Sequence, residues 1–136
     1  MVVPFKFRDQ WMHNPTSVLA EPINYGGVYS VLMAGYYAKV VNQLNEGDVV
    51  LDGGANVGAL SLLVSKRVNK VVAVEANPVN YKYLLKNINK NNLTNVIPIN
   101  AALADHKGPI QFEGQGETGH ISSNGVTIQC TTIDDI

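Results

Sequence analysis

The chain has 136 residues, of which 46% are hydrophobic and 15% are charged, and its formal net charge at pH 7 is −1. This length and composition predict one globular domain and exclude a disordered chain. The small net charge, with Lys and Arg scattered along the sequence, gives no sign of a nucleic-acid partner. No apolar run reaches the roughly 18 residues that a membrane-spanning helix needs, so we expect no membrane partner.

The single cysteine, Cys130, excludes an internal disulfide. It lies in an alternating, strand-like run, which favours a buried apolar role over a reactive thiol. The three histidines lack the spacing of a metal site, so we expect no metal. The first 11 residues lack the apolar segment of a signal peptide, and we therefore expect a cytoplasmic protein.

Residues 1–26 are predicted to be irregular, because Pro4, Pro15, Pro22 and the pair Gly26-Gly27 interrupt any regular pattern. Apolar residues at helical spacing then predict a helix over 28–44. We expect residues 1–45 to form an irregular segment and a helix that packs on a domain formed by residues 46–136.

Three short apolar runs predict strands over 48–51, 71–74 and 96–100, and helices are predicted between them. The first helix covers 57–67. The second begins at Asn77-Pro78, where Asn77 caps the helix and Pro78 takes its first position. A strand-helix-strand-helix-strand order in about 50 residues predicts a parallel sheet with right-handed crossovers.

The pattern changes after Ala104. Residues 109–112 and 126–131 predict two strands joined by a glycine-rich connector over 114–120. They are most simply an antiparallel pair added to the parallel core. Thr132 is predicted to cap a helix that begins at the end of the chain.

A glycine-rich turn, Asp52-Gly53-Gly54-Ala55-Asn56-Val57-Gly58, joins the first predicted strand to the following helix. Glycines allow a ligand to approach the backbone closely, and the start of a helix offers unpaired N–H groups. Glu75 ends the next strand, where an acid suits a ribose diol. Together these features predict a cofactor that contains a nucleoside.

Two cofactor classes are possible for this turn, a dinucleotide and S-adenosylmethionine. The dinucleotide fingerprint G-x-G-x-x-G requires a glycine at position 55, where the chain has Ala55. An acid-x-Gly-x-Asn-x-Gly spacing is met from Asp52 to Gly58. The carboxylate of Asp52 is unfavourable beside a pyrophosphate but suits the ammonium and sulfonium groups of S-adenosylmethionine (SAM). The spacing therefore favours SAM, with an NAD-dependent oxidoreductase as the weaker alternative.

Several segments resemble the FkbM-type SAM-dependent methyltransferases: residues 50–58, Val74-Glu75-Ala76-Asn77-Pro78, Asn91 with Asn95-Val96, residues 100–105 and the terminal residues 131–136. The resemblance covers about residues 46–136. It implies an α/β fold with the Rossmann-like sheet of class I methyltransferases, in which a parallel βαβαβ core carries an additional antiparallel hairpin. It also implies SAM as the cofactor.

The resemblance assigns cofactor-binding residues position by position. The methionine end of the cofactor would be lined by residues of the glycine-rich turn, Asp52, Gly54, Ala55, Asn56 and Gly58. Glu75 would accept hydrogen bonds from both ribose hydroxyls, with Asn77 near the same edge, and Asn100 and Ala101 would approach the adenine. The alternatives are a solvated acid at a strand end for Glu75 and an ordinary strand-end cap for Asn100.

The family resemblance further implies methyl transfer to an oxygen of a small molecule or sugar. A base would assist such an acceptor, and the candidates are Asp105, His106, Glu117 and His120. The two histidines fit exposed turn positions better than catalytic ones, so no catalytic residue is assigned.

The family's sheet continues for four further strands, whereas this chain stops where the fourth core strand is expected. We therefore expect either a truncated chain or a strand supplied by another chain or by a second copy, which predicts a homo-oligomer. A second hypothesis is a non-catalytic, degenerate methyltransferase module that serves in assembly or cofactor binding.

Overall fold

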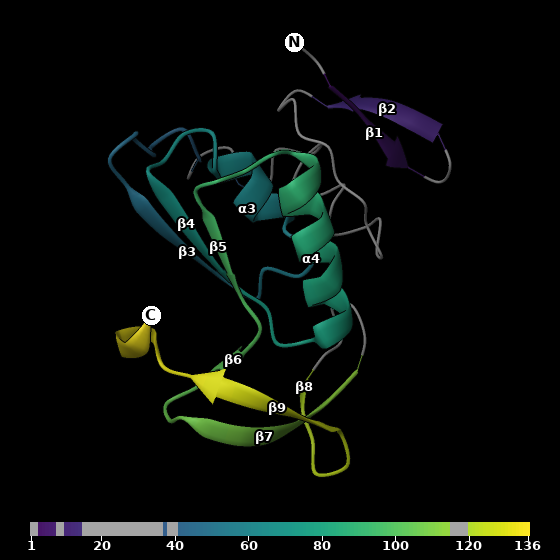
Figure 1. Ribbon diagram of the computed structural model, residues 1–136, viewed down its shortest axis with the longest axis vertical. Coiled ribbons are helices and arrows are strands. Elements are labelled where there is room, and N and C mark those ends of the chain that lie inside the picture. Colours follow the sequence, from purple (N-terminus) through teal and green to yellow (C-terminus); the bar gives the residue numbers. More distant parts are fainter. Residues whose placement is uncertain (1–2, 8–9, 15–36, 38–40, 115–119) are drawn as a thin grey trace.

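A computed structural model describes residues 3–7, 10–14, 37, 41–114 and 120–136 (Figure 1). Its centre is a three-stranded parallel sheet of β3 (Val49–Gly53), β4 (Lys70–Val74) and β5 (Val96–Ile99), in that order. The strands are in register, so that Gly53, Val74 and Ile99 lie level at the carboxyl edge. The predicted α/β fold with a parallel sheet is confirmed.

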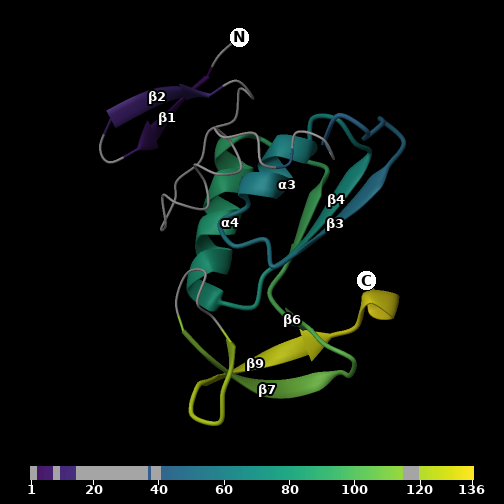
Figure 2. The same cartoon turned by 180° about the vertical axis from the view of Figure 1, so that it is seen from behind.

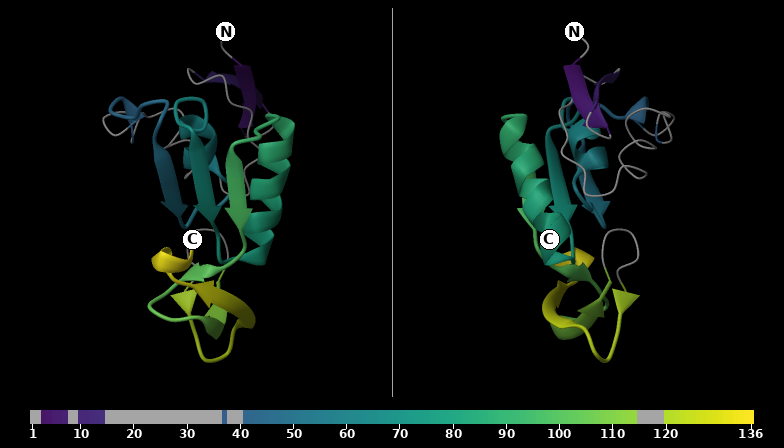
Figure 3. Two further views of the ribbon diagram at one scale, coloured as in Figure 1. Left: turned by 60° about the vertical axis from the view of Figure 1, so that its left-hand side comes forward. Right: turned by 90° about the vertical axis from the view of Figure 1, so that its right-hand side faces the viewer.

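Helices α3 (Ala59–Val64) and α4 (Pro78–Lys90) lie on the same face of this sheet (Figure 3). Right-handed crossovers place both helices on one face because the chain crosses the sheet in a single direction. Buried Leu84 and Ile88 of α4 pack there against Val71 and Val96 of the sheet. This core fixes the carboxyl ends of the strands relative to the start of α4.

The predicted cap of α4 is confirmed. The side-chain oxygen of Asn77 accepts hydrogen bonds from the N–H groups of Val79 (2.9 Å) and Asn80 (3.4 Å). Helix α3 is shorter than predicted, because Gly58 takes a left-handed conformation with φ of 89° and delays the helix to Ala59. Further along α4, the buried amide of Asn87 donates to the carbonyl of Val57 at 2.8 Å.

A second sheet follows the parallel one. It contains β6 (Ala102–Leu103), β7 (Gly108–Glu113), β8 (His120–Ile121) and β9 (Val126–Thr131), in the order β6-β9-β7-β8. The antiparallel pairing of β7 with β9 is confirmed. The pair is added to the parallel core as part of a separate sheet, because the chain turns away after β5 and β6 pairs with β9. Figure 2 shows the second sheet at the carboxyl edge of the first.

The chain ends in a short 3-10 helix, η2 (Ile133–Asp135), at the position where a helix start was predicted. Thr132 occupies its N-cap position, but the Thr132 hydroxyl donates to the carboxylate of Asp135 at 2.5 Å instead of accepting from a backbone N–H. The capping contact therefore joins two side chains.

The N-terminal segment differs from the prediction. Strands β1 (Val3–Phe7) and β2 (Gln10–Asn14) pair antiparallel where an irregular segment was expected. A two-stranded ribbon accommodates Pro4 because each strand has an edge without ladder hydrogen bonds. Most of the helix predicted over 28–44 lies outside the described residues, although Val41 donates to the carbonyl of Tyr37 at 2.9 Å, as in a helix. The division at residue 45 stays a prediction.

The side chain of Cys130 is buried, as predicted. Its Sγ lies 3.1 Å from the carbonyl oxygen of Gly108 and 3.2 Å from that of His106. Across the described ranges, no helix is long and apolar enough to cross a membrane.

We predict that Gly58→Ala lowers the free energy of unfolding by about 1–3 kcal/mol, because alanine is strained at this φ. A Cβ at position 58 would also lie 2.5 Å from Cδ1 of the buried Leu84. Urea unfolding of the purified chain measures the effect. Gly47→Ala is the control, because its Cβ meets nothing within 4 Å. Equal unfolding midpoints for the two variants would contradict the prediction.

Candidate cofactor-binding site

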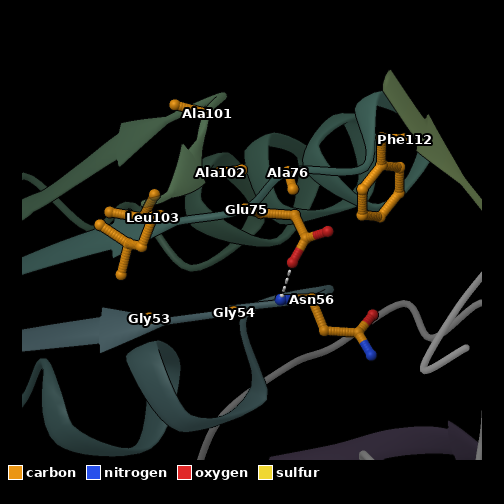
Figure 4. A pocket seen from close by; sticks show the side chains of 10 residues that line it. Gly53, Gly54, Asn56, Glu75, Ala76, Ala101, Ala102, Leu103 and Phe112 are labelled. Carbon is orange, nitrogen blue, oxygen red and sulfur yellow. Dashed lines mark hydrogen bonds between the residues drawn. The ribbon is translucent and has the colours of Figure 1, made fainter. Parts of the chain in front are cut away.

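A cavity of about 510 Å³ lies at the carboxyl ends of β3 and β4, between the parallel sheet and the second sheet (Figure 4). This edge is where open α/β sheets bind ligands. The volume falls within the roughly 300–1,000 Å³ of small-molecule sites. Residues from both sheets and from the glycine-rich turn line it: Gly53, Gly54, Asn56, Val74, Glu75, Ala76, Ala101, Ala102, Leu103 and Phe112.

The glycine-rich turn folds back over the end of β4. The N–H groups of Gly54 and Ala55 both donate to the carbonyl of Val74 at 2.9 Å. Gly54 has φ of 80° and Asn56 has φ of 53°, the left-handed region that glycine and asparagine tolerate best. A Cβ on Gly54 would meet nothing within 4 Å, so this part of the backbone is open to a ligand.

Glu75 joins this turn to the start of α4. One carboxylate oxygen accepts from the N–H of Asn56 at 2.7 Å, as Figure 4 shows, and the other accepts from the N–H of Asn77 at 2.8 Å. The second oxygen also lies 3.4 Å from the side-chain nitrogen of Asn80. Glu75 is only 6% exposed. The alternative of a solvated acid is therefore wrong, and this carboxylate is a structural part of the cavity wall.

Asp52 lies elsewhere. It is buried and does not line the cavity, and its carboxylate accepts a hydrogen bond of 2.5 Å from the hydroxyl of Ser61 in α3. Burial raises the pKa of Asp52, and hydrogen bonds from the hydroxyl and backbone N–H of Ser61 oppose this rise. The carboxylate thus lies on the helix side of the sheet. Its predicted contact with the cationic end of a cofactor stays a prediction.

Four of the predicted cofactor-binding residues line the cavity: Gly54, Asn56, Glu75 and Ala101. The other five are not among the residues that line it. Gly58 is the N-cap residue of α3 and Ala55 is buried in the core. The side chain of Asn100 donates to the carbonyl of Glu75 at 2.8 Å, which fits the alternative of a strand-end cap.

Asn77 connects the start of α4 to the second sheet. Its side-chain nitrogen donates to the carbonyl of Gly114, at the end of β7, at 3.1 Å. The same side chain caps α4 through its oxygen. One amide therefore fixes the second sheet relative to the helix beside the cavity.

An apolar wall of the cavity was not predicted from the sequence; it is formed by Ala76, Ala102, Leu103 and Phe112. Leu103 reaches the cavity because position 53 is glycine; a Cβ there would lie 2.8 Å from Cδ1 of Leu103. Apolar residues beside an acid form a suitable site for a nucleoside, because a base needs apolar contact and a ribose needs hydrogen-bond acceptors. Phe112 is far from the glycine-rich turn in sequence, and the strand pattern around it gave no functional signal.

The three candidate bases that the structure describes, Asp105, His106 and His120, are not among the residues that line the cavity. Asp105 and His106 are exposed, and Asp105 Oδ1 lies 2.8 Å from His106 Nδ1, which lowers the pKa of Asp105. His120 is exposed in β8, and Glu117 lies outside the described residues. Within the described part of the chain, no three His, Cys, Asp or Glu residues are grouped so that they could hold a metal ion.

The family model of the TRM5/TYW2 methyltransferase domain matches residues 26–131. The chain belongs to this family. It is 39% identical over 71 residues to the tRNA (guanine(37)-N(1))-methyltransferase Trm5b of Pyrococcus abyssi, which covers 52% of this chain and 22% of the relative. It is 43% identical over 65 residues to the tRNA(Phe) (4-demethylwyosine(37)-C(7)) aminocarboxypropyltransferase of Methanocaldococcus jannaschii. These residues cover 46% of this chain and 25% of the relative.

Solved structures show the same fold. The crystal structure of P. abyssi Trm5b matches with a TM-score of 0.56 and 29% identity, over 67% of this chain and 28% of that one. TYW2 of M. jannaschii, solved in complex with AdoMet (SAM), matches with a TM-score of 0.50 and 28% identity. The match covers 71% of this chain and 41% of that one. The chain spans about a quarter of the length of the curated relatives it matches.

These comparisons confirm the prediction of a SAM-dependent methyltransferase domain and of SAM as the cofactor of this family. The NAD-dependent alternative has no support among them. The resemblance to the FkbM family is wrong, because the matching family model is that of TRM5/TYW2. Several residues of the motifs that carried the resemblance line the cavity, among them Gly54, Asn56 and Glu75, and one such site can recur in different families.

The expected partners are also wrong. A small-molecule or sugar acceptor was expected and nucleic acid was not, whereas the named relatives act on tRNA. The net charge did not indicate a nucleic-acid partner, because it sums the charges of the whole chain and does not reveal locally basic surfaces. The predicted homo-oligomer and the cytoplasmic location are untested by these findings and stay predictions.

We predict that Glu75→Gln weakens SAM binding by about tenfold or more. Glutamine offers a single acceptor oxygen, so its amide nitrogen would face the N–H of Asn56 or of Asn77. Isothermal titration calorimetry measures the affinity. Glu113→Gln is the control, because Glu113 is an exposed acid of β7 that accepts from the hydroxyl of Ser122. Unchanged affinity in the Glu75 variant would contradict the assigned role.

We predict that Asp52→Asn is more stable than the wild type at pH 7. Burial raises the folded-state pKa of Asp52 above 3.8, so the wild type loses stability as the pH rises through that range, whereas asparagine does not ionise. Urea unfolding between pH 4 and pH 7 should show the difference shrinking toward low pH. Asp105→Asn is the control, because the pKa of Asp105 is lowered and no gain is expected. A less stable Asp52→Asn variant at pH 7 would refute this reasoning.

Proposed function

We propose that this chain is the cofactor-binding part of an enzyme that methylates tRNA at N1 of guanosine 37. The observation that carries the proposal is the match of the TRM5/TYW2 domain to residues 26–131, which includes every residue of the cavity wall. Two relatives named as tRNA (guanine(37)-N(1))-methyltransferases support the same reaction, one from Pyrococcus abyssi and one from Aedes aegypti. The latter is 42% identical over 55 residues, which cover 40% of this chain and 10% of the relative.

The residues of the cavity suit SAM. A carboxylate has about four acceptor sites, and the bonds from Asn56, Asn77 and Asn80 occupy three of those on Glu75, which leaves capacity for a ribose hydroxyl. Ala101, Leu103 and Phe112 offer apolar surface for the adenine. The open backbone at Gly54 lets the rest of the cofactor approach the turn.

When bound, SAM supplies an electrophilic methyl group on a sulfonium. Direct transfer depends on alignment of the reacting atoms and on exclusion of water more than on acid–base groups. This chain contributes to both requirements. Its turn is fixed by Glu75 and by the carbonyl of Val74, and its apolar wall keeps water from one side of the cavity.

A second candidate reaction is transfer of the aminocarboxypropyl group of SAM to tRNA. The M. jannaschii aminocarboxypropyltransferase is 43% identical to this chain over 65 residues, which favours this candidate. The two reactions break different bonds at one sulfur. Methyl transfer leaves S-adenosylhomocysteine, whereas aminocarboxypropyl transfer leaves 5′-methylthioadenosine.

Two labelled forms of SAM distinguish these reactions. The full chain is incubated with tRNA transcripts that carry guanosine or adenosine at position 37, and with tRNA that carries 4-demethylwyosine there. We expect label from the methyl group, and not label from the carboxyl group, to enter only the guanosine transcript. Carboxyl label in the 4-demethylwyosine tRNA would support the second candidate. No label in any RNA, with SAM bound normally, would overturn both.

A further inference from the structure

The charges of the chain are distributed unevenly along its sequence. Between Gly53 and Ala104 there are six basic residues and one acidic residue, Glu75. Glu75 is buried, whereas all six basic residues are exposed: Lys66, Arg67, Lys70, Lys82, Lys86 and Lys90. This part of the chain therefore presents only positive side-chain charge to solvent, although the net charge of the whole chain is −1.

Helix α4 carries three of these residues on one side. Lys82, Lys86 and Lys90 follow one another at intervals of four residues, on the side turned away from buried Leu84 and Ile88. The helix contains no acidic residue. Like charges at this spacing destabilise a helix by a few tenths of a kcal/mol per pair, so the lysines are not explained by helix stability.

The turn after α3 adds two more cations beside this helix. The side chain of Asn95 donates to the carbonyls of Ser65 (2.7 Å) and Val68 (3.1 Å), which holds the turn after α3 against the turn after α4. Figure 1 shows α3 and α4 next to each other on one face of the sheet. We call the exposed cations of this region the basic face: Lys66, Arg67, Lys82, Lys86 and Lys90.

The basic face leads away from the cavity. Helix α4 begins next to Glu75 in the cavity wall and continues for 13 residues, or roughly 20 Å. A partner that contacts these lysines and also places a reacting group in the cavity must therefore be long and carry repeated negative charge. A nucleic-acid backbone has both properties, and a small anion has neither.

We propose that the basic face binds the phosphate backbone of the RNA that the enzyme modifies. This inference rests on the proposed tRNA acceptor and assigns a surface to it. Tyr83 supports the arrangement, because Lys86 Nζ lies 4.7 Å from the centre of the Tyr83 ring. This contact places an aromatic ring among the lysines, where it can contribute to RNA contacts.

The test compares two double variants with the same change in net charge. Lys82→Gln/Lys86→Gln removes two cations from the basic face. Lys70→Gln/Lys107→Gln removes two from elsewhere: Lys70 begins β4 beside the backbone of Asp48, and Lys107 pairs with Asp135 at 2.7 Å. The affinity for an unmodified tRNA transcript is measured in the full chain from 0.05 to 0.3 M KCl. SAM affinity and thermal unfolding are measured in parallel as checks on folding.

For Lys82→Gln/Lys86→Gln we expect about tenfold weaker tRNA binding near 0.1 M KCl. The slope of the logarithm of the association constant against the logarithm of the KCl concentration should be smaller in magnitude by about 1.5. SAM affinity should remain unchanged in both variants, and the control should bind tRNA like the wild type. Equal losses in the two variants would overturn the inference while leaving the tRNA acceptor intact. A wild type that binds no tRNA would overturn both proposals.

A membrane is the competing polyanion. Vesicles containing one quarter phosphatidylglycerol in phosphatidylcholine are therefore tested by co-sedimentation. We expect no binding that depends on Lys82 and Lys86. Vesicle binding that is lost in this double variant, with tRNA binding unchanged, would overturn the assignment of the basic face to RNA.

Discussion

The arrangement of the site depends on the carboxylate of Glu75. Its two oxygens accept backbone N–H groups from Asn56, in the glycine-rich turn, and from Asn77, at the start of α4. These two segments come from different β-α units, and Glu75 joins them alongside the bonds from the turn to the carbonyl of Val74 and from Asn87 of α4 to the carbonyl of Val57. A buried carboxylate satisfied by such donors is stable where an unpaired one is not. The cavity wall therefore exists before any cofactor arrives, which reduces the ordering that binding requires.

Two acids end adjacent strands and have opposite environments. Asp52 faces the helices, where burial favours its protonated form and Ser61 is its partner. Glu75 faces the cavity and the backbone that surrounds it. The first acid joins β3 to α3 through the hydroxyl of Ser61, and the second lies at the ligand-facing edge. A common position at strand ends thus does not give two residues a common function, because each strand end is followed by a different turn.

The second sheet adds a wall to the carboxyl edge of the parallel strands and so forms one side of the cavity. Its apolar residues Leu103 and Phe112 close the cavity on the side opposite the glycine-rich turn, and the amide of Asn77 connects this sheet to α4. The basic face lies on the helical side of the parallel sheet instead. The two surfaces are joined by α4, whose first residues contact the cavity wall and whose last turns carry lysines. Mutation of the basic face can therefore test acceptor binding without changing the cavity that is proposed to hold the cofactor.

Local sequence determined the elements that depend on neighbouring residues. The cap at Asn77, the three parallel strands, the glycine-rich turn and the cofactor class follow from short motifs, because helix capping and backbone conformation are set within a few residues. Tertiary structure alone decided that Asp52 is buried against Ser61, that Phe112 reaches the cavity, and that the turn after α3 is held against the turn after α4 by Asn95. These contacts join residues far apart in sequence, and their geometry is fixed only when the sheets and helices pack.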